Sequence, residues 1–522
     1  MRLGIDFGTT RTVVACADRG NYPVLGFVDD AGDSHDWIPS VVAERDGELL
    51  FGFDALAAGD RANVVRSFKR LLSFPTRTDA TPGREVTIGA VSIGVGELVT
   101  RFLAAVRDAI VERSSVSKEA RASELRSVVA VPANASSAQR LLTLDAFRRA
   151  ELNPIAMLNE PSAAGFEYTH RHRDTLTSKR DHVVVYDLGG GTFDASLVRM
   201  RGASHEVLAT AGVNELGGDD FDAVIVGLVL AKAKLAAEDV DPIALARLRE
   251  QCRDAKERLN PSSRKLSIDL EAALGDAAPQ AEVAVPVAEI YEACAPLVEA
   301  SIEAMLPVMT RLEGSEAFAG GEPAERDDIA GIYVVGGASE LPIVGRALRA
   351  RFGRRVHRSP YASGAVAIGL AIAGGESAGF ELVDRFSRTF GVFREADAGS
   401  EITFDPIFTE GTVLPTAGDA PVAFRRRYRA AHNVGHFRFL ECSALSDDGR
   451  PRGHMVFSGD VRFPFEPRLG DRDLSDVQVE RLSSGDTGPR IEEEYRLDEH
   501  GIVAVTIRNL DAGFERVFQH GA

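Results

Sequence analysis

Two glycine-rich turns, each starting from an aspartate at the end of an apolar strand, are the parts of this sequence best suited to chemistry. The first has the sequence DFGTT (residues 6–10) and the second DLGGGT (residues 187–192); we call them the first and second phosphate turns. Small residues let backbone N–H groups approach phosphate oxygens, and hydroxyl groups add donors. An aspartate beside them can hold magnesium directly or through water. The two turns therefore predict a metal–phosphate site.

The residues of these turns have separate expected roles. Asp6 and Asp187 are candidates for facing each other across the metal, and Thr192 for donating to a terminal phosphate. Each turn alone could be an ordinary turn with a capping aspartate, but consecutive glycines weaken regular structure, and a turn wrapping phosphates explains them better. The candidates for contact with phosphates are Gly8, Thr9, Thr10, Gly189, Gly190 and Gly191.

A third turn contains Gly336 and Gly337, directly after the apolar strand predicted at 331–335. It would let a nucleoside lie against the backbone. An ordinary strand-to-helix turn explains these glycines equally well when the turn is considered alone.

The elements that must position these turns alternate between strand and helix patterns from residue 1 to about 375, which indicates α/β architecture. The first two turns share one plan, a weak internal repeat that predicts two related lobes facing one ligand. Apolar residues at helical spacing predict a helix over 244–259. The apolar stretch 364–375 is too short to span a bilayer and predicts a buried helix.

After residue 375 the pattern changes to short alternating runs separated by turns. Residues 491–497 alternate with period two, and a turn leads into a second predicted strand at 502–507. Further strands are predicted at 437–440 and 454–457. This part is expected to be a small all-β domain, a sandwich.

Composition limits the possible functions. The 522 residues are long for one core, and 44% hydrophobic with 26% charged residues is typical of a globular protein. The net charge of −18 argues against a general nucleic-acid or anionic-membrane surface. The four cysteines lie far apart and give no metal or disulfide framework. The N-terminus lacks a signal-peptide pattern, so a cytoplasmic location is expected.

Several motifs in this order resemble the heat-shock chaperone family typified by DnaK. They are DFGTT, VPA, NEPSAA, DLGGGTFD, LGGDDFD and VVGG. The resemblance implies an actin-like (ribonuclease H-type), two-lobed ATPase domain over residues 1–376. A linker over 377–385 and a β-sandwich substrate-binding domain over 386–522 would follow. The implied cofactors are ATP or ADP and Mg²⁺.

The resemblance also implies roles for individual residues. Lys69 matches the catalytic lysine, which positions the attacking water and stabilises charge on the γ-phosphate, and Glu160 matches a glutamate that orients this water. Asp194 joins the carboxylates around magnesium and the nucleophile, and Lys256 matches a residue of the nucleotide pocket. Taken in isolation, Lys69 could be a solvated lysine and Glu160 a cap before Pro161.

This sequence also departs from the family. Glu257 stands where many relatives carry arginine and others an apolar residue, and Glu340 stands where arginine is usual. Arginine planes stack on adenine as a carboxylate cannot. The segment 380–384 is less apolar than the family's linker, and no helical lid is expected after the last strand. Phe437 is expected near the central peptide pocket, which it would narrow.

The leading hypothesis is a lidless, ATP-dependent chaperone that binds unfolded peptides. A J-domain co-chaperone and an exchange factor are possible partners, but no nucleic acid or membrane is expected. An alternative is a nucleotide-sensing regulatory or scaffold module with one dedicated protein partner. A small-molecule kinase shares the phosphate turns, but it needs a substrate pocket with a catalytic base, which we do not identify in the sequence.

Overall fold

The computed structural model describes residues 1–58, 63–73, 85–201, 204–213, 215–310, 329–375, 381–416, 418–470, 472–482 and 488–519. The chain divides into two compact units. Unit 1 comprises Met1–Arg70, Asp108–Ala133 and Asn159–Glu381, and unit 2 comprises Leu71–Arg107, Asn134–Leu158 and Leu382–Ala522. Within the described ranges, no helix combines the length and the apolar character needed to cross a bilayer.

The first sheet of unit 1 carries the first phosphate turn. Its strand β1 (Arg2–Phe7) runs parallel to β11 (Arg126–Val131) and antiparallel to β2 (Arg11–Cys16). The buried helix α11 (Ala365–Gly374) packs against these strands and confirms the helix predicted at 364–375. Gly4 makes this close packing possible, because a Cβ there would lie 2.3 Å from the Ala367 carbonyl oxygen.

The second sheet of unit 1 carries the other two turns. The five of its strands that lie within unit 1 follow the order β19-β18-β13-β14-β15. Because β13 and β18 are parallel and Asp187 pairs with Val335, the turns after both strands emerge at the same edge of the sheet. Helix α5 (Glu160–His172) packs on this sheet and contacts α11. The strands are β13 (His182–Leu188), β14 (Phe193–Arg201), β15 (Ser204–Val213), β18 (Ile329–Val335) and β19 (Val356–Arg358).

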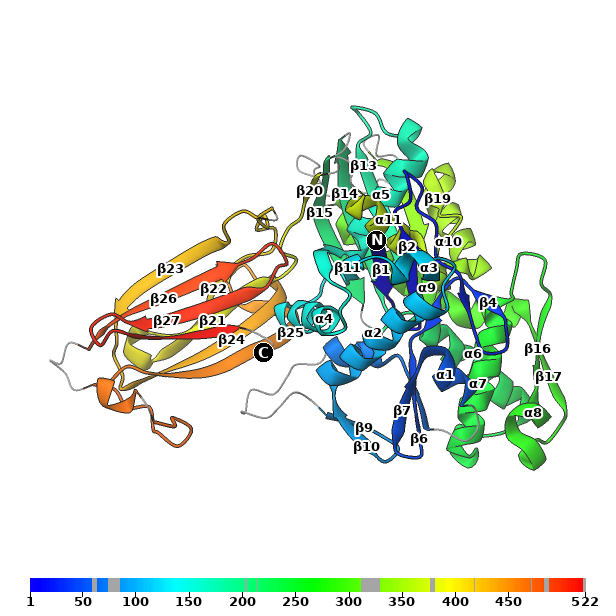
Figure 1. Cartoon of the computed structure of the whole chain (residues 1–522), viewed down its shortest axis with the longest axis horizontal. Helices are drawn as coiled ribbons and strands as arrows, with labels where there is room; N and C mark the ends of the chain where they lie inside the picture. The colour runs from blue at the N-terminus through cyan, green and yellow to red at the C-terminus, as the bar shows by residue number, and fades with distance from the viewer. Residues whose placement is uncertain are drawn as a thin grey trace. The chain divides into compact units, whose positions relative to one another are not determined.

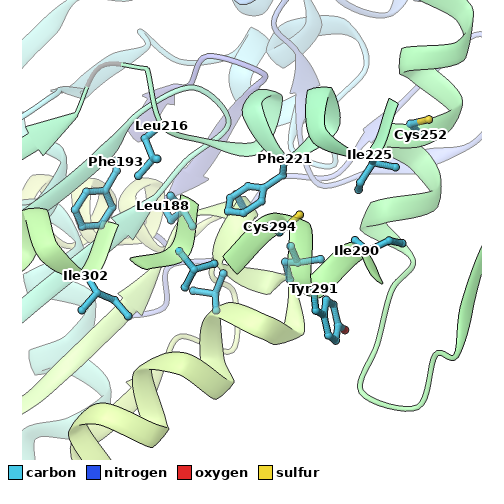
Figure 2. Close-up of a cluster of buried hydrophobic side chains, with 14 of the residues drawn as sticks. Leu188, Phe193, Leu216, Phe221, Ile225, Cys252, Ile290, Tyr291, Cys294 and Ile302 are labelled. Carbon is cyan, nitrogen blue, oxygen red and sulfur yellow. The ribbon is translucent and has the colours of Figure 1, made fainter. Parts of the chain in front are cut away.

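The residues at both ends of the second phosphate turn are buried in a large apolar core. Leu188 and Phe193, on either side of the glycines and Thr192, are fully buried. Figure 2 shows them together with Phe221 from α6 (Gly218–Ala233) and Cys294 from α9 (Val287–Thr310). Burying a large apolar side chain contributes about 1.5–3 kcal/mol. The ends of the turn are therefore firmly held while the turn itself stays free to contact a ligand.

Unit 2 contains two antiparallel four-stranded sheets, which lie face to face in Figure 1 and share one core. Phe390 and Phe439 enter this core from one sheet, and Tyr495 and Val505 from the other. The strands predicted from the sequence over 437–507 correspond to strands of these sheets, although β27 begins one residue after the predicted start at 502. The first sheet has the order β22 (Glu401–Phe408), β21 (Thr389–Ala396), β24 (Val434–Leu445), β25 (Pro451–Pro464); the second has β23 (Val422–Arg429), β26 (Arg490–Leu497), β27 (Val503–Asn509), β28 (Phe514–Gln519).

Strand β26 shows how an acidic run can form a strand. Its successive side chains point to opposite faces. Glu492 and Glu494 lie on one face, where both bind Arg508. Glu493 lies on the other face, fully buried, and accepts hydrogen bonds from Arg394 and Tyr495. Every glutamate of the run is thus paired.

The mixed α/β class is confirmed, whereas the two-lobed arrangement, the sandwich assignment and the domain boundaries stay predictions. Residues 376–380 of the predicted linker lie outside the described residues. The remaining elements are β3 (Phe27–Val28), β4 (Ser34–His35), β5 (Ile38–Pro39), β6 (Val41–Arg45), β7 (Glu48–Phe51), β8 (Asn63–Arg66), β9 (Glu85–Ile88), β10 (Val91–Gly94), β12 (Pro154–Asn159), β16 (Lys265–Asp269), β17 (Glu282–Pro286), β20 (Glu381–Val383), α1 (Gly52–Ala57), α2 (Val95–Glu112), α3 (Ser117–Arg121), α4 (Ser137–Arg149), α7 (Pro242–Glu257), α8 (Leu270–Leu274) and α10 (Pro342–Phe352).

Candidate nucleotide site

The two phosphate turns lie directly against each other. A Cβ on Gly190 would lie 2.4 Å from the Thr10 hydroxyl oxygen, and one on Gly191 would lie 2.7 Å from the Thr9 methyl group. A side chain at either glycine would displace its neighbour, so the contact itself requires glycine. The structure therefore brings together two turns that are far apart in the sequence. The other glycines of these turns approach their own backbone, with a Cβ at Gly8 2.2 Å from the Arg11 carbonyl oxygen and one at Gly189 3.4 Å from that of Thr192.

The third turn lies beside the second. Gly336 adopts a φ of 84°, and a Cβ there would lie 2.4 Å from both the Asp187 carboxylate and the Leu188 carbonyl oxygen. This position therefore needs glycine for its backbone conformation and for space. Gly337 is less constrained, because the nearest atom to its Cβ position is 4.0 Å away, in Ser363.

The first residues of α6 support the second phosphate turn through backbone hydrogen bonds. The sequence did not predict this role. The backbone N–H groups of Gly218 and Asp219 donate to the carbonyl oxygens of Gly189 and Gly190, at 3.0 and 2.8 Å. Lys256 donates to the Gly218 carbonyl oxygen at 2.9 Å and also binds a buried aspartate of α6. Lys256 thus holds the start of α6, which in turn bonds to the second phosphate turn; its place in the nucleotide pocket stays a prediction.

Lys69 and Glu160 form a buried ion pair. Lys69 lies in a short 3₁₀ helix, η2 (Phe68–Ser73), and its Nζ is 2.8 Å from the Glu160 Oε1. Burial lowers the pKa of Lys69, but Glu160 and Asp6 outweigh it, so the pKa is raised. Lys69 is therefore a charged group held in place, and it does not have the solvated position that was its alternative.

Three buried aspartates, Asp6, Asp187 and Asp194, lie close enough to this pair to interact with its charges. Burial and the charge of Glu160 raise the pKa of Asp6 to about 7 and that of Asp194 to about 8, against the opposite effect of Lys69. Burial and the same glutamate raise the pKa of Asp187 well above its ordinary value. One ammonium group does not neutralise four carboxylates, so the cluster favours binding of a cation.

These carboxylates suit magnesium better than they suit a metal ion whose ligands all come from the protein. Among the described residues, no group of three or more acidic, histidine or cysteine side chains has a geometry that could hold a metal ion. Magnesium commonly uses one or two carboxylates and completes its shell with water and substrate phosphates. Asp194 accepts a hydrogen bond from Thr192, but its buried Oδ1 has no hydrogen-bond partner within the described part of the chain. An acceptor is thus left for a ligand or water.

The two glutamates that depart from the expected pattern are both paired with arginines. Glu257 binds Arg11, the residue directly after the first phosphate turn. Glu340 binds Arg358 with a separation of 3.1 Å. Neither carboxylate is therefore an uncompensated charge beside the site.

A comparison with models of known protein families identifies the family of this chain. The family model described as Hsp70 protein matches residues 2–402, about three quarters of the chain. The chain belongs to the Hsp70 family. Hsp70 proteins are in general chaperone-like ATPases that bind ATP or ADP with Mg²⁺, and they work with polypeptide substrates and co-chaperones. Most of unit 2's two sheets lies beyond the matched residues.

In this Hsp70 chain, Arg140 of α4 is held inside unit 2. Its guanidinium donates to the carbonyl oxygens of Ala135 and His500, at 3.3 and 3.1 Å. Burial lowers its pKa, an effect that Asp384 and Glu441 oppose. Glu441 also accepts hydrogen bonds from the Ser137 backbone N–H at the start of α4. The start of this helix is therefore bound to the β-strand region by buried charges.

Thermal stability of the ligand-free protein is expected to fall as pH rises from about 5 to 8. The folded state keeps protons on Asp6 and Asp194 up to about pH 7 and 8, whereas unfolded aspartates release them near pH 4. The unfolded state therefore binds fewer protons in this range, and stability decreases with pH. Thermal unfolding across this range should show a smaller fall for Asp194→Asn and an unchanged one for the exposed Asp239→Asn. An equally steep fall for Asp194→Asn would contradict the raised pKa.

Proposed function

We propose that this Hsp70 protein binds Mg²⁺–ATP at the two phosphate turns and hydrolyses it slowly. The observation that carries the proposal is the buried Lys69–Glu160 pair, enclosed by the aspartates at the ends of β1 and β13. Four carboxylates and an ammonium group beside two glycine turns in mutual contact suit a polyphosphate and a cation. A purely structural ion pair would not explain the three additional aspartates.

The proposed mechanism depends mainly on positioning and electrostatics, as is general for phosphoryl transfer. Backbone N–H groups of Thr9, Thr10, Gly190 and Gly191 donate to phosphate oxygens. Those of Gly8 and Gly189 already donate to the carbonyl oxygens of Asp6 and Thr192, at 3.1 and 3.0 Å. The Lys69 ammonium stabilises the negative charge that develops on the transferred phosphoryl group. Glu160, which is paired with this ammonium group, orients the attacking water. The free oxygen of Asp194 accepts a hydrogen bond from this water.

Asp6 and Asp187 are the proposed carboxylates for magnesium. When bound, the ion would neutralise charge on the phosphates and orient them. Its positive charge would also keep both aspartates ionised at neutral pH, despite their burial. Thr192, whose hydroxyl already donates to Asp194, would hold this carboxylate in place as the turn receives the terminal phosphate.

We further propose that the β-strand region of unit 2 binds polypeptide under the control of the nucleotide. A dedicated protein partner is the second candidate, and one observation favours it. Phe437, expected beside a peptide pocket, is only 5% exposed and packs with Phe439 and Phe465 in the shared core. Gly435 is covered as well, since a Cβ there would lie 2.4 Å from the Phe465 ring. Aromatic side chains thus fill this part of the unit.

Binding measurements distinguish the two candidates. A labelled apolar peptide is titrated into the full chain with ADP or with ATP, and proteins retained by the immobilised chain are identified in parallel. Saturable peptide binding that differs between nucleotides supports the chaperone function. Retention of one stoichiometric protein without saturable peptide binding supports the dedicated partner. Absence of both would contradict a polypeptide-binding function.

A further inference from the structure

Two segments of unit 1 are rich in arginine, although the whole chain has a net charge of −18. Residues 342–361, which include α10 and β19 (Figure 1), contain six arginines and no acidic residue. Residues 170–181, from the end of α5 to the start of β13, contain four lysines and arginines and two aspartates. We call the exposed side chains of these two segments the arginine surface.

The topology of the second sheet brings the two segments together. Strands β13, β18 and β19 are parallel, so the residues that precede β13 and β19 enter the sheet at the same edge, opposite to the phosphate turns. The ring centroids of His172 and His357 are 5.3 Å apart, and the Arg171 guanidinium lies 5.4 Å from the ring centroid of Tyr361. The 13 residues of α5 separate His172 from Glu160 of the nucleotide site by about 18 Å. The segments therefore form one surface, apart from that site.

Neighbouring acidic side chains pair with only part of this positive charge. Arg351 and Arg358 each bind a glutamate, at 2.7 and 3.1 Å. Three further arginines are exposed and form no ion pair with a residue that the structure describes: Arg173, Arg349 and Arg354. Guanidinium groups bind carboxylate or phosphate groups through paired N–H donors. The surface is therefore suited to an anionic partner.

We propose that the arginine surface binds an acidic polypeptide segment in an extended conformation. The position of β19 favours a polypeptide. This strand is at the edge of its sheet, where it pairs with β18, and no described strand pairs with its other side. An extended polypeptide can pair with these open backbone groups while its carboxylates contact the arginines. A nucleic acid can use only the arginines, and the net charge of −18 opposes its approach.

The test is fluorescence anisotropy of a labelled ten-residue peptide that alternates glutamate and valine, titrated with the full chain. Binding should be saturable, should weaken as salt screens the charges, and should be lost when glutamine replaces the glutamates of the peptide. Because each exposed charge contact contributes modestly, Arg349→Gln and Arg354→Gln should each weaken binding about two- to fivefold. The triple variant that also carries Arg173→Gln should weaken it about 10- to 100-fold. Thermal unfolding shows that the variants fold.

Arg249→Gln is the matched control. Arg249 of α7 is also exposed and forms no ion pair with a residue in the described ranges, but it lies outside both segments. Its replacement should leave the affinity for the peptide unchanged. Wild-type affinity in the triple variant, or an equal loss in Arg249→Gln, would overturn the arginine surface. Tighter binding of an oligonucleotide of equal charge would also overturn the proposal, because it would indicate a nucleic acid.

Residues 311–328 of this chain are the competing occupant, since they contain six acidic residues and directly precede β18. A variant in which glutamine replaces the four glutamates of this segment tests the alternative. If the peptide binds this variant and not the wild type, the chain's own segment occupies the surface, and a separate partner is excluded. Failure of the peptide to bind either protein would overturn the proposal, whereas the proposed ATP binding, which is measured separately, would stand.

Discussion

Replacing Lys69 with alanine is expected to lower the rate of ATP hydrolysis about 100- to 1,000-fold, as for other groups that stabilise developing charge. The Lys69 side chain is 10% exposed and its ammonium is bound to Glu160. Its loss removes the positive charge facing the phosphates and leaves the carboxylates without compensation. Single-turnover measurement of phosphate release gives the rate, and calorimetry shows whether ATP still binds.

Lys232→Ala is the control for this prediction. Lys232 of α6 also forms an ion pair, with Glu289 at 2.8 Å, but its side chain is 35% exposed. Hydrolysis should proceed at the wild-type rate in this variant. A Lys69→Ala protein that remains folded and turns over like the wild type would exclude Lys69 from catalysis.

Replacing Gly190 with alanine is expected to weaken ATP binding about 10- to 100-fold, because forcing extra atoms into a packed site costs about 1–3 kcal/mol. The added Cβ would lie 2.4 Å from the Thr10 hydroxyl oxygen and 2.5 Å from its methyl carbon. The two phosphate turns would have to separate, which misplaces their N–H donors. Calorimetric titration with Mg²⁺–ATP measures the affinity.

Gly227→Ala is a matched substitution without a clash. Gly227 lies within α6, and no heavy atom outside its own neighbourhood lies within 4 Å of its Cβ position. Since alanine favours helix by about 0.8–1 kcal/mol over glycine, this variant should be slightly more stable and bind ATP normally. Wild-type affinity in Gly190→Ala would mean that the contact between the turns is not part of the binding site.

Features with a local signal were predictable from the sequence. The helix expected at 244–259 corresponds to α7 at Pro242–Glu257, because its apolar spacing and a flanking proline are local. The aspartates at strand ends were found because a buried strand followed by glycines is a local pattern. The similarity of the two phosphate turns predicted that they face one ligand, whereas their direct contact is seen only in the structure.

Contacts between distant segments were not predictable in this way. Nothing in the sequence near Ser67 indicates its bond to Asp219, and Arg11 gives no sign of its partner Glu257. Lys256 was assigned to the nucleotide pocket by resemblance, and its bond to the Gly218 carbonyl oxygen was not foreseen. Likewise Phe437 gave a strand signal, but its packing in the core depends on the opposite sheet. Pairing across the fold, and not local spacing, decides these roles.

The most direct test of the proposed site is a titration of the full chain with ATP, ADP and GTP in the presence of Mg²⁺, with hydrolysis followed in the same samples. The account predicts saturable binding of ATP and ADP, slow release of phosphate from ATP, and loss of both activities when Mg²⁺ is removed. Absence of saturable ATP binding, or hydrolysis that persists at the wild-type rate in Lys69→Ala, would contradict it.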